Sequence, residues 1–212
     1  MKKILSALQR WMSKQQTQKN PLDTMPDFHN LKYLIAIEPS GSCLIAWNKL
    51  RECERRLEMF KWVEALNDPA SPQHRILLND ATSAFLLTYE AVLQFTKEQI
   101  KTLSTKQFYE WLGKQPKYDL TVKGLRTLRH FEAHVELKSP QSKIIASSEK
   151  VSRTWRLPPL YATDLDRLLT KPLSETDLSD WNSKVDQVDA VSMFTDGIEK
   201  LKAILEAAEG IK

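Results

Sequence analysis

Apolar residues recur along most of this chain every three or four positions, the spacing of one helix face. The pattern predicts long helices over about 43–67, 71–96, 118–136 and 186–208. Shorter helices are predicted over about 104–113, 163–170 and 175–184. Each long helix has an apolar stripe to bury, so we expect an all-α fold: a bundle of about four long helices with short connecting helices.

One segment has a different pattern. Residues 143–146 and 151–155 are rich in β-branched residues and flank the polar sequence Ser148-Glu149-Lys150. Two such runs around a short polar turn predict a small β-hairpin at about 143–156. The same region lies between two predicted helices, so the hairpin is an addition to the bundle rather than a second domain.

The first 18 residues predict a separate amphipathic helix. Basic residues surround one apolar face of this helix. That face is formed by Ile4, Leu5, Leu8, Trp11 and Met12. We expect this helix to pack on the protein's own body or on a partner subunit; the alternative is contact with a membrane surface. Residues 19–41 are expected to be a linker or loop, and residues 42–212 a single helical-bundle domain.

Composition limits the kinds of partner and the cellular environment that we expect for this protein. The 212 residues include 31 Lys and Arg against 27 Asp and Glu, a mildly basic balance that permits contact with nucleic acid without requiring it. No apolar run reaches the roughly 18–20 residues of a membrane span, so no transmembrane segment is expected. Cys43 and Cys53 fall on one predicted helix roughly 15 Å apart, too far for a disulfide. Buried thiols of a cytoplasmic protein are the expected interpretation.

The predicted helix over 118–136 carries the one group of residues that suggests chemistry. On an ideal helix, its apolar positions lie on one side: Gly124, Leu128, Phe131 and Val135. Basic positions lie on the opposite side: Lys123, Arg126, His130 and His134. Arg129 lies on the flank. The helix is therefore expected to bury one stripe and to expose a basic, imidazole-bearing stripe.

An imidazole beside a guanidinium is sufficient for RNA cleavage without a metal. Histidine titrates near neutral pH, so it can remove the proton of a ribose 2′-OH or protonate the leaving oxygen. Arginine stays charged and can stabilise the charge that develops on the phosphate oxygens. The histidines and arginines of this helix are thus candidates for such chemistry, with Lys123 and Arg126 as the candidate RNA-binding residues.

A zinc site is the alternative for the two histidines. His130 and His134 are four residues apart, which suits two ligands of one zinc ion. The acidic residue of a zinc-protease motif directly follows the first His, whereas Glu132 lies two residues after it. No third ligand is evident nearby, and neither a metal nor another cofactor is expected.

The sequence Arg129-His130-Phe131-Glu132-Ala133-His134 resembles the motif of the HEPN superfamily. That motif is an Arg, four to six residues and a His on a helix of an all-α bundle, with a polar residue directly after the Arg. Members are commonly metal-independent endoribonucleases of defence, toxin or mobile-element systems. They are typically homodimers whose Arg and His residues line one cleft.

The resemblance implies that Arg129 and His134 are catalytic and that His130 supports them. It also implies RNA as substrate, a homodimer, and a protein partner or inhibitor. Glu136 stands where some toxin members carry a Tyr. The alternative function is a non-catalytic helical protein that uses its basic face or its N-terminal helix to bind a partner.

Overall fold

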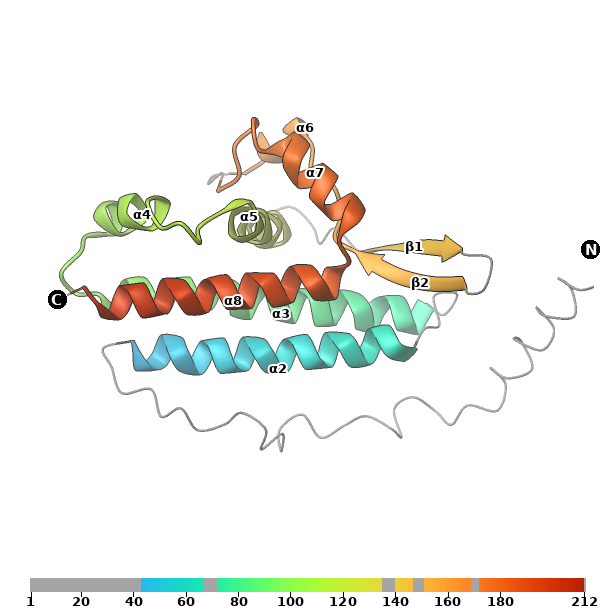
Figure 1. The fold of residues 1–212 in the computed structure, drawn as a ribbon, viewed down its shortest axis with the longest axis horizontal. Coiled ribbons are helices and arrows are strands. Elements are labelled where there is room, and N and C mark those ends of the chain that lie inside the picture. The colour runs from blue at the N-terminus through green and yellow to red at the C-terminus, as the bar shows by residue number, and fades with distance from the viewer. Residues whose placement is uncertain (1–42, 67–71, 135–139, 147–150, 169–171, 212) are drawn as a thin grey trace, which may run out of the picture. The chain divides into compact units, whose positions relative to one another are not determined.

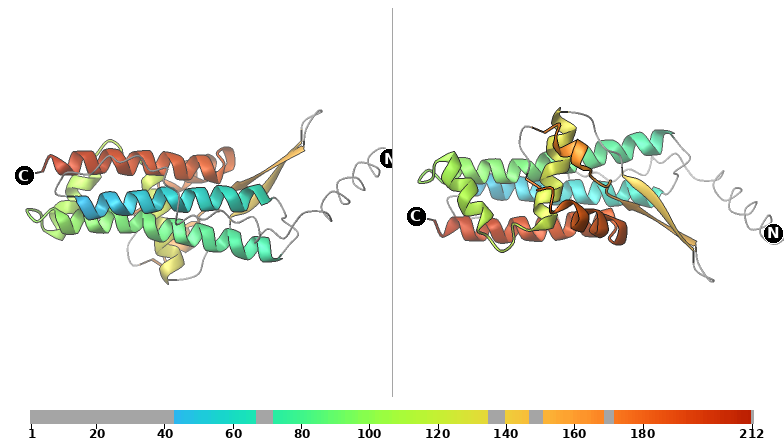
Figure 2. Two further views of the ribbon diagram at one scale, coloured as in Figure 1. Left: turned by 90° about the horizontal axis from the view of Figure 1, so that it is seen from below. Right: turned by 90° about the horizontal axis from the view of Figure 1, so that it is seen from above.

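Three long helices, α2 (Leu44–Leu66), α3 (Pro72–Gln99) and α8 (Ala190–Glu209), run side by side (Figures 1 and 2). The computed structural model describes residues 43–66, 72–134, 140–146, 151–168 and 172–211. A fourth helix, α5 (Leu120–His134), crosses α3 and α8 on one side (Figure 2). The shorter helices α4, α6 and α7 lie on that same side (Figure 1): α4 (Thr105–Gly113), α6 (Ala162–Leu165) and α7 (Leu178–Gln187).

The described part of the chain has seven helices and one two-stranded sheet, so the predicted all-α class with a small hairpin is confirmed. The core joins the three long helices through aromatic rings. Phe85 of α3 stacks on Phe194 of α8 at 4.0 Å between ring centroids, and Phe60 of α2 meets Phe194 edge-on at 5.0 Å. All three side chains are fully buried, as the apolar stripes of these helices require.

The last two helices differ from the prediction at their junction. The sequence pattern predicts one helix from about 186, but α7 continues to Gln187 and α8 begins at Ala190. Val188 is extended, and the Asp189 side chain accepts a hydrogen bond from the Ser192 backbone at 2.8 Å. An Asp that accepts this bond satisfies an otherwise unpaired N–H of the first helical turn, so the chain starts a new helix here.

The predicted hairpin is confirmed. Strands β1 (Gln141–Ala146) and β2 (Val151–Arg156) pair antiparallel, with Gln141 opposite Arg156 and Lys143 opposite Thr154. Trp155 is on the opposite face from these residues and is 5% exposed, with its ring edge-on to His74 of α3 at 5.6 Å. The hairpin is therefore attached to the bundle through one face, and its other face is turned toward α7.

Both cysteines are buried, as expected. Cys43 precedes α2, and Cys53 lies within it. Burial, with a smaller effect of the nearby carboxylates of Glu54 and Glu52, raises the pKa of the Cys53 thiol well above its usual value. A buried thiol with a raised pKa is unreactive and contributes to packing.

Two glycines set how closely α5 approaches its neighbours. The ring of Trp181 on α7 lies directly over Gly124, in the space that a Cβ atom would occupy. Gly197 on α8 leaves room for Leu125, whose Cδ1 would lie 2.6 Å from a Cβ there. α5 is thus in close contact with both α7 and α8.

A charged cluster links the start of α5 to α7 and α8. The Lys200 ammonium lies 2.6 Å from Asp119 and 2.6 Å from Asp196, and Lys184 lies 3.2 Å from Asp196. Burial by itself would raise the pKa of Asp196, but hydrogen bonds from Lys200, Thr121 and Lys184 outweigh it, and the pKa is lowered. Such a carboxylate stabilises the fold at neutral pH and loses this contribution in acid.

We expect Asp196→Asn to lose less unfolding free energy than the wild type as the pH falls. The stabilisation by Asp196 is present above the carboxylate's ordinary pKa and is lost as the pH falls through its lowered value, from about pH 5 downward. The difference in unfolding free energy between the wild type and Asp196→Asn should therefore shrink between about pH 6 and pH 2.5, measured by urea denaturation. Asp80→Asn, at an exposed position of α3, is the control; an equal change there would contradict the expectation.

The predicted N-terminal helix over 1–18 and the linker over 19–41 lie outside the described residues. Among the described helices, α3 is long and apolar enough to cross a membrane by length and composition. Of its most apolar stretch, 56% is buried inside the protein, where it forms the core with α2 and α8. The absence of a membrane span remains a prediction.

Candidate functional site

The helix that carries the candidate residues is more enclosed than its sequence predicts. The expected apolar stripe is buried at Gly124, Leu128 and Phe131, while Val135 lies outside the described residues. Phe131 packs with Leu165 and Leu168, outside the main core. Val122 and Leu125, which belong to neither expected stripe, are also fully buried. α5 therefore packs on two sides, and only part of its surface is accessible.

The prediction that Arg126 belongs to an exposed basic face is wrong, because this residue is only 4% exposed. Its Nε and Nη2 atoms donate to the two carboxylate oxygens of Glu90 on α3, at 2.8 and 3.0 Å. Its Nη1 donates to the Tyr118 hydroxyl at 2.6 Å, and the guanidinium lies 5.4 Å from the centre of the Tyr109 ring. The contact between α3 and α5, with the two tyrosines beside the guanidinium, places this arginine inside the protein.

The ion pair keeps Arg126 charged in spite of its burial. Desolvation by itself lowers the pKa of a buried guanidinium, but the hydrogen bonds and charge of Glu90 outweigh it and raise the pKa of Arg126. All the donor groups that a phosphate would use are thus directed to Glu90 and Tyr118. Arg126 has a structural role in this arrangement, between α3 and α5.

Arg129 is partly accessible, with 22% of its side chain exposed. Its Nη1 lies 3.6 Å from the Glu132 carboxylate, one turn along α5, and the Ser83 hydroxyl of α3 donates a hydrogen bond to the other oxygen of Glu132. Burial raises the pKa of Glu132, and the positive charge of Arg129 opposes that shift. Glu132 thus holds Arg129 near the surface and is itself anchored on α3.

His130 lies beside the buried ion pair. Its Nε2 atom is 3.9 Å from Oε1 of Glu90, and 18% of its side chain is exposed. Glu90 therefore serves two neighbours on α5, Arg126 and His130. His134 is the last residue of α5, and its side chain is outside the described part.

Lys123 lies one turn before Arg126 and is 31% exposed. Its ammonium is 3.4 Å from the carboxylate of Asp177, the residue that precedes α7. Half-exposed pairs of this kind contribute at most about 1 kcal/mol and exchange partners readily. Lys123 is therefore still accessible to an anion, in contrast to Arg126.

Sequence reasoning missed the two carboxylates that organise the site, Glu90 and Glu132. Glu132 had a local signal, because residues three apart on a helix are neighbours and Glu132 is three after Arg129. Glu90 had a weaker one: it is an acidic residue between the core positions Tyr89 and Val92, and a carboxylate in such a place requires a partner. The identity of that partner could not be read from the sequence.

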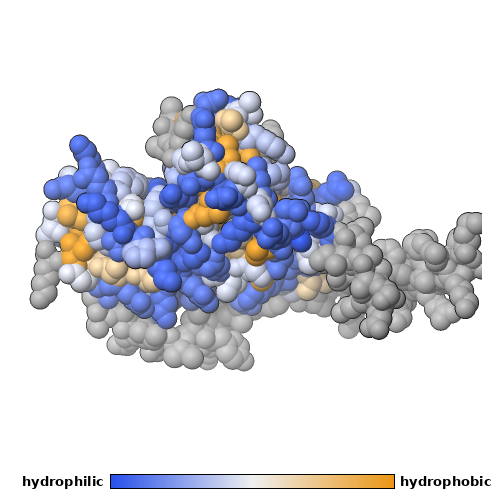
Figure 3. Space-filling model, turned by 45° about the horizontal axis from the view of Figure 1, so that its top comes forward, coloured by the Kyte–Doolittle hydropathy of each residue, from blue (hydrophilic) through white to orange (hydrophobic). Residues whose placement is uncertain are grey.

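Within the described ranges, no group of three or more His, Cys, Asp or Glu side chains is arranged to hold a metal ion. The side of the fold that carries α4, α6 and α7 is mostly hydrophilic, with small and separate apolar patches (Figure 3). Hydrophilic side chains therefore dominate what this face can offer to a ligand. Comparisons of the chain with protein-family models, curated proteins and solved structures gave no match.

Proposed function

We propose that this protein is a HEPN-like, metal-independent endoribonuclease of a defence, toxin or mobile-element module. The observation that supports this best is that the neighbouring residues Arg129 and His130 each lie beside a carboxylate that a hydrogen bond between α3 and α5 holds in place. Glu132 next to Arg129 is bonded to Ser83, and Glu90 next to His130 is bonded to Arg126. Groups held in this way need little reorganisation to meet a substrate.

The proposed reaction needs only groups of the chain and of RNA. His134 removes the proton of a ribose 2′-OH, and the resulting oxygen attacks the adjacent phosphorus. Arg129 stabilises the charge on the phosphate oxygens as the bond to the 5′ oxygen breaks. That oxygen takes a proton from a second imidazole, the His134 of the second protomer, and a 2′,3′-cyclic phosphate remains.

The proposal assigns Lys123, but not Arg126, to binding RNA, because only Lys123 is accessible to a phosphate. It places the α5 helices of two protomers near a two-fold interface, so that both copies contribute to one cleft. It also places the protein in the cytoplasm, where RNA is present and thiols stay reduced. A two-fold dimer mass by light scattering at micromolar concentration is the expected assembly.

A second candidate function is supported by a specific observation. Arg126 pairs with Glu90 across the α3–α5 contact, and Arg129 pairs with Glu132 of its own helix, so both arginines already have carboxylate partners within the chain. A non-catalytic helical protein that binds a partner through its polar surface needs no more than this. Direct assay separates the two functions.

We expect the purified protein to cleave RNA in the presence of EDTA, since no metal takes part in the proposed reaction. The products should carry 2′,3′-cyclic phosphate ends, and DNA of the same sequence should stay intact because it lacks the 2′-OH. Gel analysis and end-group mass spectrometry on several structured and single-stranded RNAs measure both properties. RNA that remains intact would favour the interaction protein, and cleavage lost with EDTA would favour a metal-dependent enzyme.

A further inference from the structure

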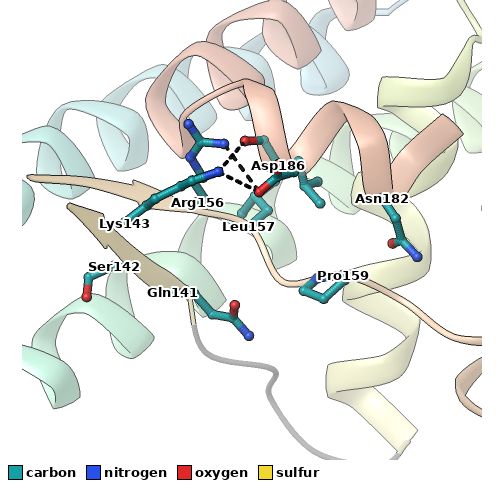
Figure 4. Close-up of a pocket in the computed structure, with 9 residues that line it drawn as sticks. Gln141, Ser142, Lys143, Arg156, Leu157, Pro159, Asn182 and Asp186 are labelled. Atoms are coloured by element: carbon teal, nitrogen blue, oxygen red, sulfur yellow. Dashed lines mark hydrogen bonds and ion pairs between the residues drawn. The ribbon is translucent and has the colours of Figure 1, made fainter. Parts of the chain in front are cut away.

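A second polar site lies where the base of the hairpin meets α7 (Figure 4). Gln141 and Arg156 are directly opposite each other in the sheet, and Lys143 is two residues along from Gln141. Residues two apart, and residues directly opposite, share one face of a sheet. This places Lys143 and Arg156 on the face turned toward α7, opposite to the face on which Trp155 packs against the bundle.

Arg156 is the less accessible of the two cations. Its side chain is 12% exposed, and its Nε and Nη1 atoms are buried without a hydrogen-bond partner among the described residues. The Oγ1 atom of Thr154, two residues earlier on the same strand, is also buried without a hydrogen-bond partner among the described residues. Buried guanidinium N–H groups are costly to leave unsatisfied, and such atoms point to a ligand or to bound water.

Among the described residues, one carboxylate faces both cations. Asp186 near the end of α7 accepts a hydrogen bond from Lys143 at 2.7 Å, and its Oδ1 is 3.8 Å from Nη1 of Arg156 (Figure 4). Its side chain is 72% exposed, so its position is held mainly by these cations. One carboxylate against two cations leaves a net positive charge, and the contact shows that the two cations converge on one oxyanion.

The cavity beside these residues has a volume of about 260 Å³. Its apolar wall comes from Leu157, Pro159 and Val185. Asn182 also lines it, but its amide is bonded to the backbone of Leu160 at both ends, at 2.8 and 2.9 Å, and so fixes the wall. The space is slightly below the roughly 300 Å³ at which small-molecule pockets begin, enough for one small ring or short chain.

We propose that this pocket binds a small molecule through a phosphate or carboxylate group, which Lys143 and Arg156 hold in place of Asp186. The apolar part of the ligand lies against Leu157, Pro159 and Val185. Both ligand types share the oxyanion, and a planar, doubly donating guanidinium accommodates either. The site uses none of the residues of the proposed ribonuclease, so it stands or fails separately from that function.

The test uses phenyl phosphate and benzoate as probes, with inorganic phosphate as the ligand that lacks an apolar part. Titration of the wild type should shift the backbone amide NMR signals of Lys143, Leu157 and Asp186 in a saturable manner. Tighter binding of one probe identifies the oxyanion, and weaker binding of inorganic phosphate than of phenyl phosphate identifies the apolar wall. Absence of a saturable shift with all three probes, in both the wild type and Asp186→Asn, would overturn the proposal.

Two exposed positions provide variants with opposite expected effects. Lys143→Gln should weaken probe binding at least about fivefold, because it removes one charged donor. Asp186→Asn should tighten it about three- to tenfold, because it removes the competing carboxylate. Neither side chain is in the core, so folding should be preserved, which circular dichroism verifies.

The chain offers a matched control pair on α2. Lys61 and Glu58 are also 2.7 Å apart and have comparable exposure, 41% and 51%. Lys61→Gln and Glu58→Gln should leave probe affinity unchanged. Equal effects at both pairs would mean that the probes respond to general surface charge. Weaker binding in Asp186→Asn would mean that Asp186 itself holds the ligand. Either result would refute the proposed exchange.

Discussion

Replacing His134 with alanine is expected to reduce RNA cleavage about 10²- to 10⁴-fold, because the variant lacks the group that accepts the 2′-OH proton. Arg129→Ala should reduce it about 10²- to 10³-fold through the loss of charge stabilisation in the transition state. His130→Ala should have a smaller effect, since it supports the other two residues. Initial rates on one defined RNA, with EDTA present, measure all three.

Stability and a surface control decide whether such losses are catalytic. Arg129 pairs with Glu132 at 22% and 13% exposure, so its removal should cost roughly 1–2 kcal/mol of unfolding free energy, less than the loss expected at the buried Arg126. Arg75→Ala, at an exposed position of α3, should retain full cleavage. A variant at Arg129 or His134 that is folded and fully active would remove that residue from the proposed mechanism.

Breaking the buried pair between Glu90 and Arg126 is expected to have the largest effect on stability. Arg126→Leu or Glu90→Leu alone should lower the unfolding free energy by about 3–5 kcal/mol, because each leaves an uncompensated charge in the interior. The side chains are 5% and 11% exposed, so water can do little to replace the lost partner. Urea denaturation at neutral pH measures the change.

The double variant Glu90→Leu/Arg126→Leu makes this prediction specific to the pair. It should be more stable than either single variant and come within about 1–2 kcal/mol of the wild type, because no buried charge is left unpaired. The pair of Lys49 and Glu52 on α2, at 35% and 31% exposure, is the partly exposed control, and Glu52→Gln should cost at most about 1 kcal/mol. Additive effects of the two single substitutions would contradict the pairing.

Arg126 shows why a helical wheel could not define the candidate site. The wheel correctly places Leu128 and Phe131 on a buried stripe, because a residue's angle depends only on its position along one helix. It places Arg126 with Lys123 and His130 for the same reason. Which of these side chains is exposed to solvent depends on the positions of α3 and of the segment that carries Tyr109 and Tyr118. Neither position is a property of the α5 sequence.

The helices themselves follow from local rules. The apolar period defines α2, α3 and α5 to within a few residues, and Gly210 ends α8 as predicted. The hairpin follows from its β-branched runs in the same way. The junction between the last two helices was predicted at about residue 185, roughly four residues before the capping Asp189.

The amino-acid sequence by itself thus determined the all-α class, the hairpin and the positions of most helices. Each of these depends on spacing along the chain over a few turns. The tertiary structure alone decided that Glu90 pairs with Arg126 over 36 residues, that Ser83 anchors Glu132, and that Lys143 and Arg156 converge on Asp186. Contacts between distant segments depend on how helices cross and strands dock, and burial then sets whether a charge is structural or accessible to a ligand.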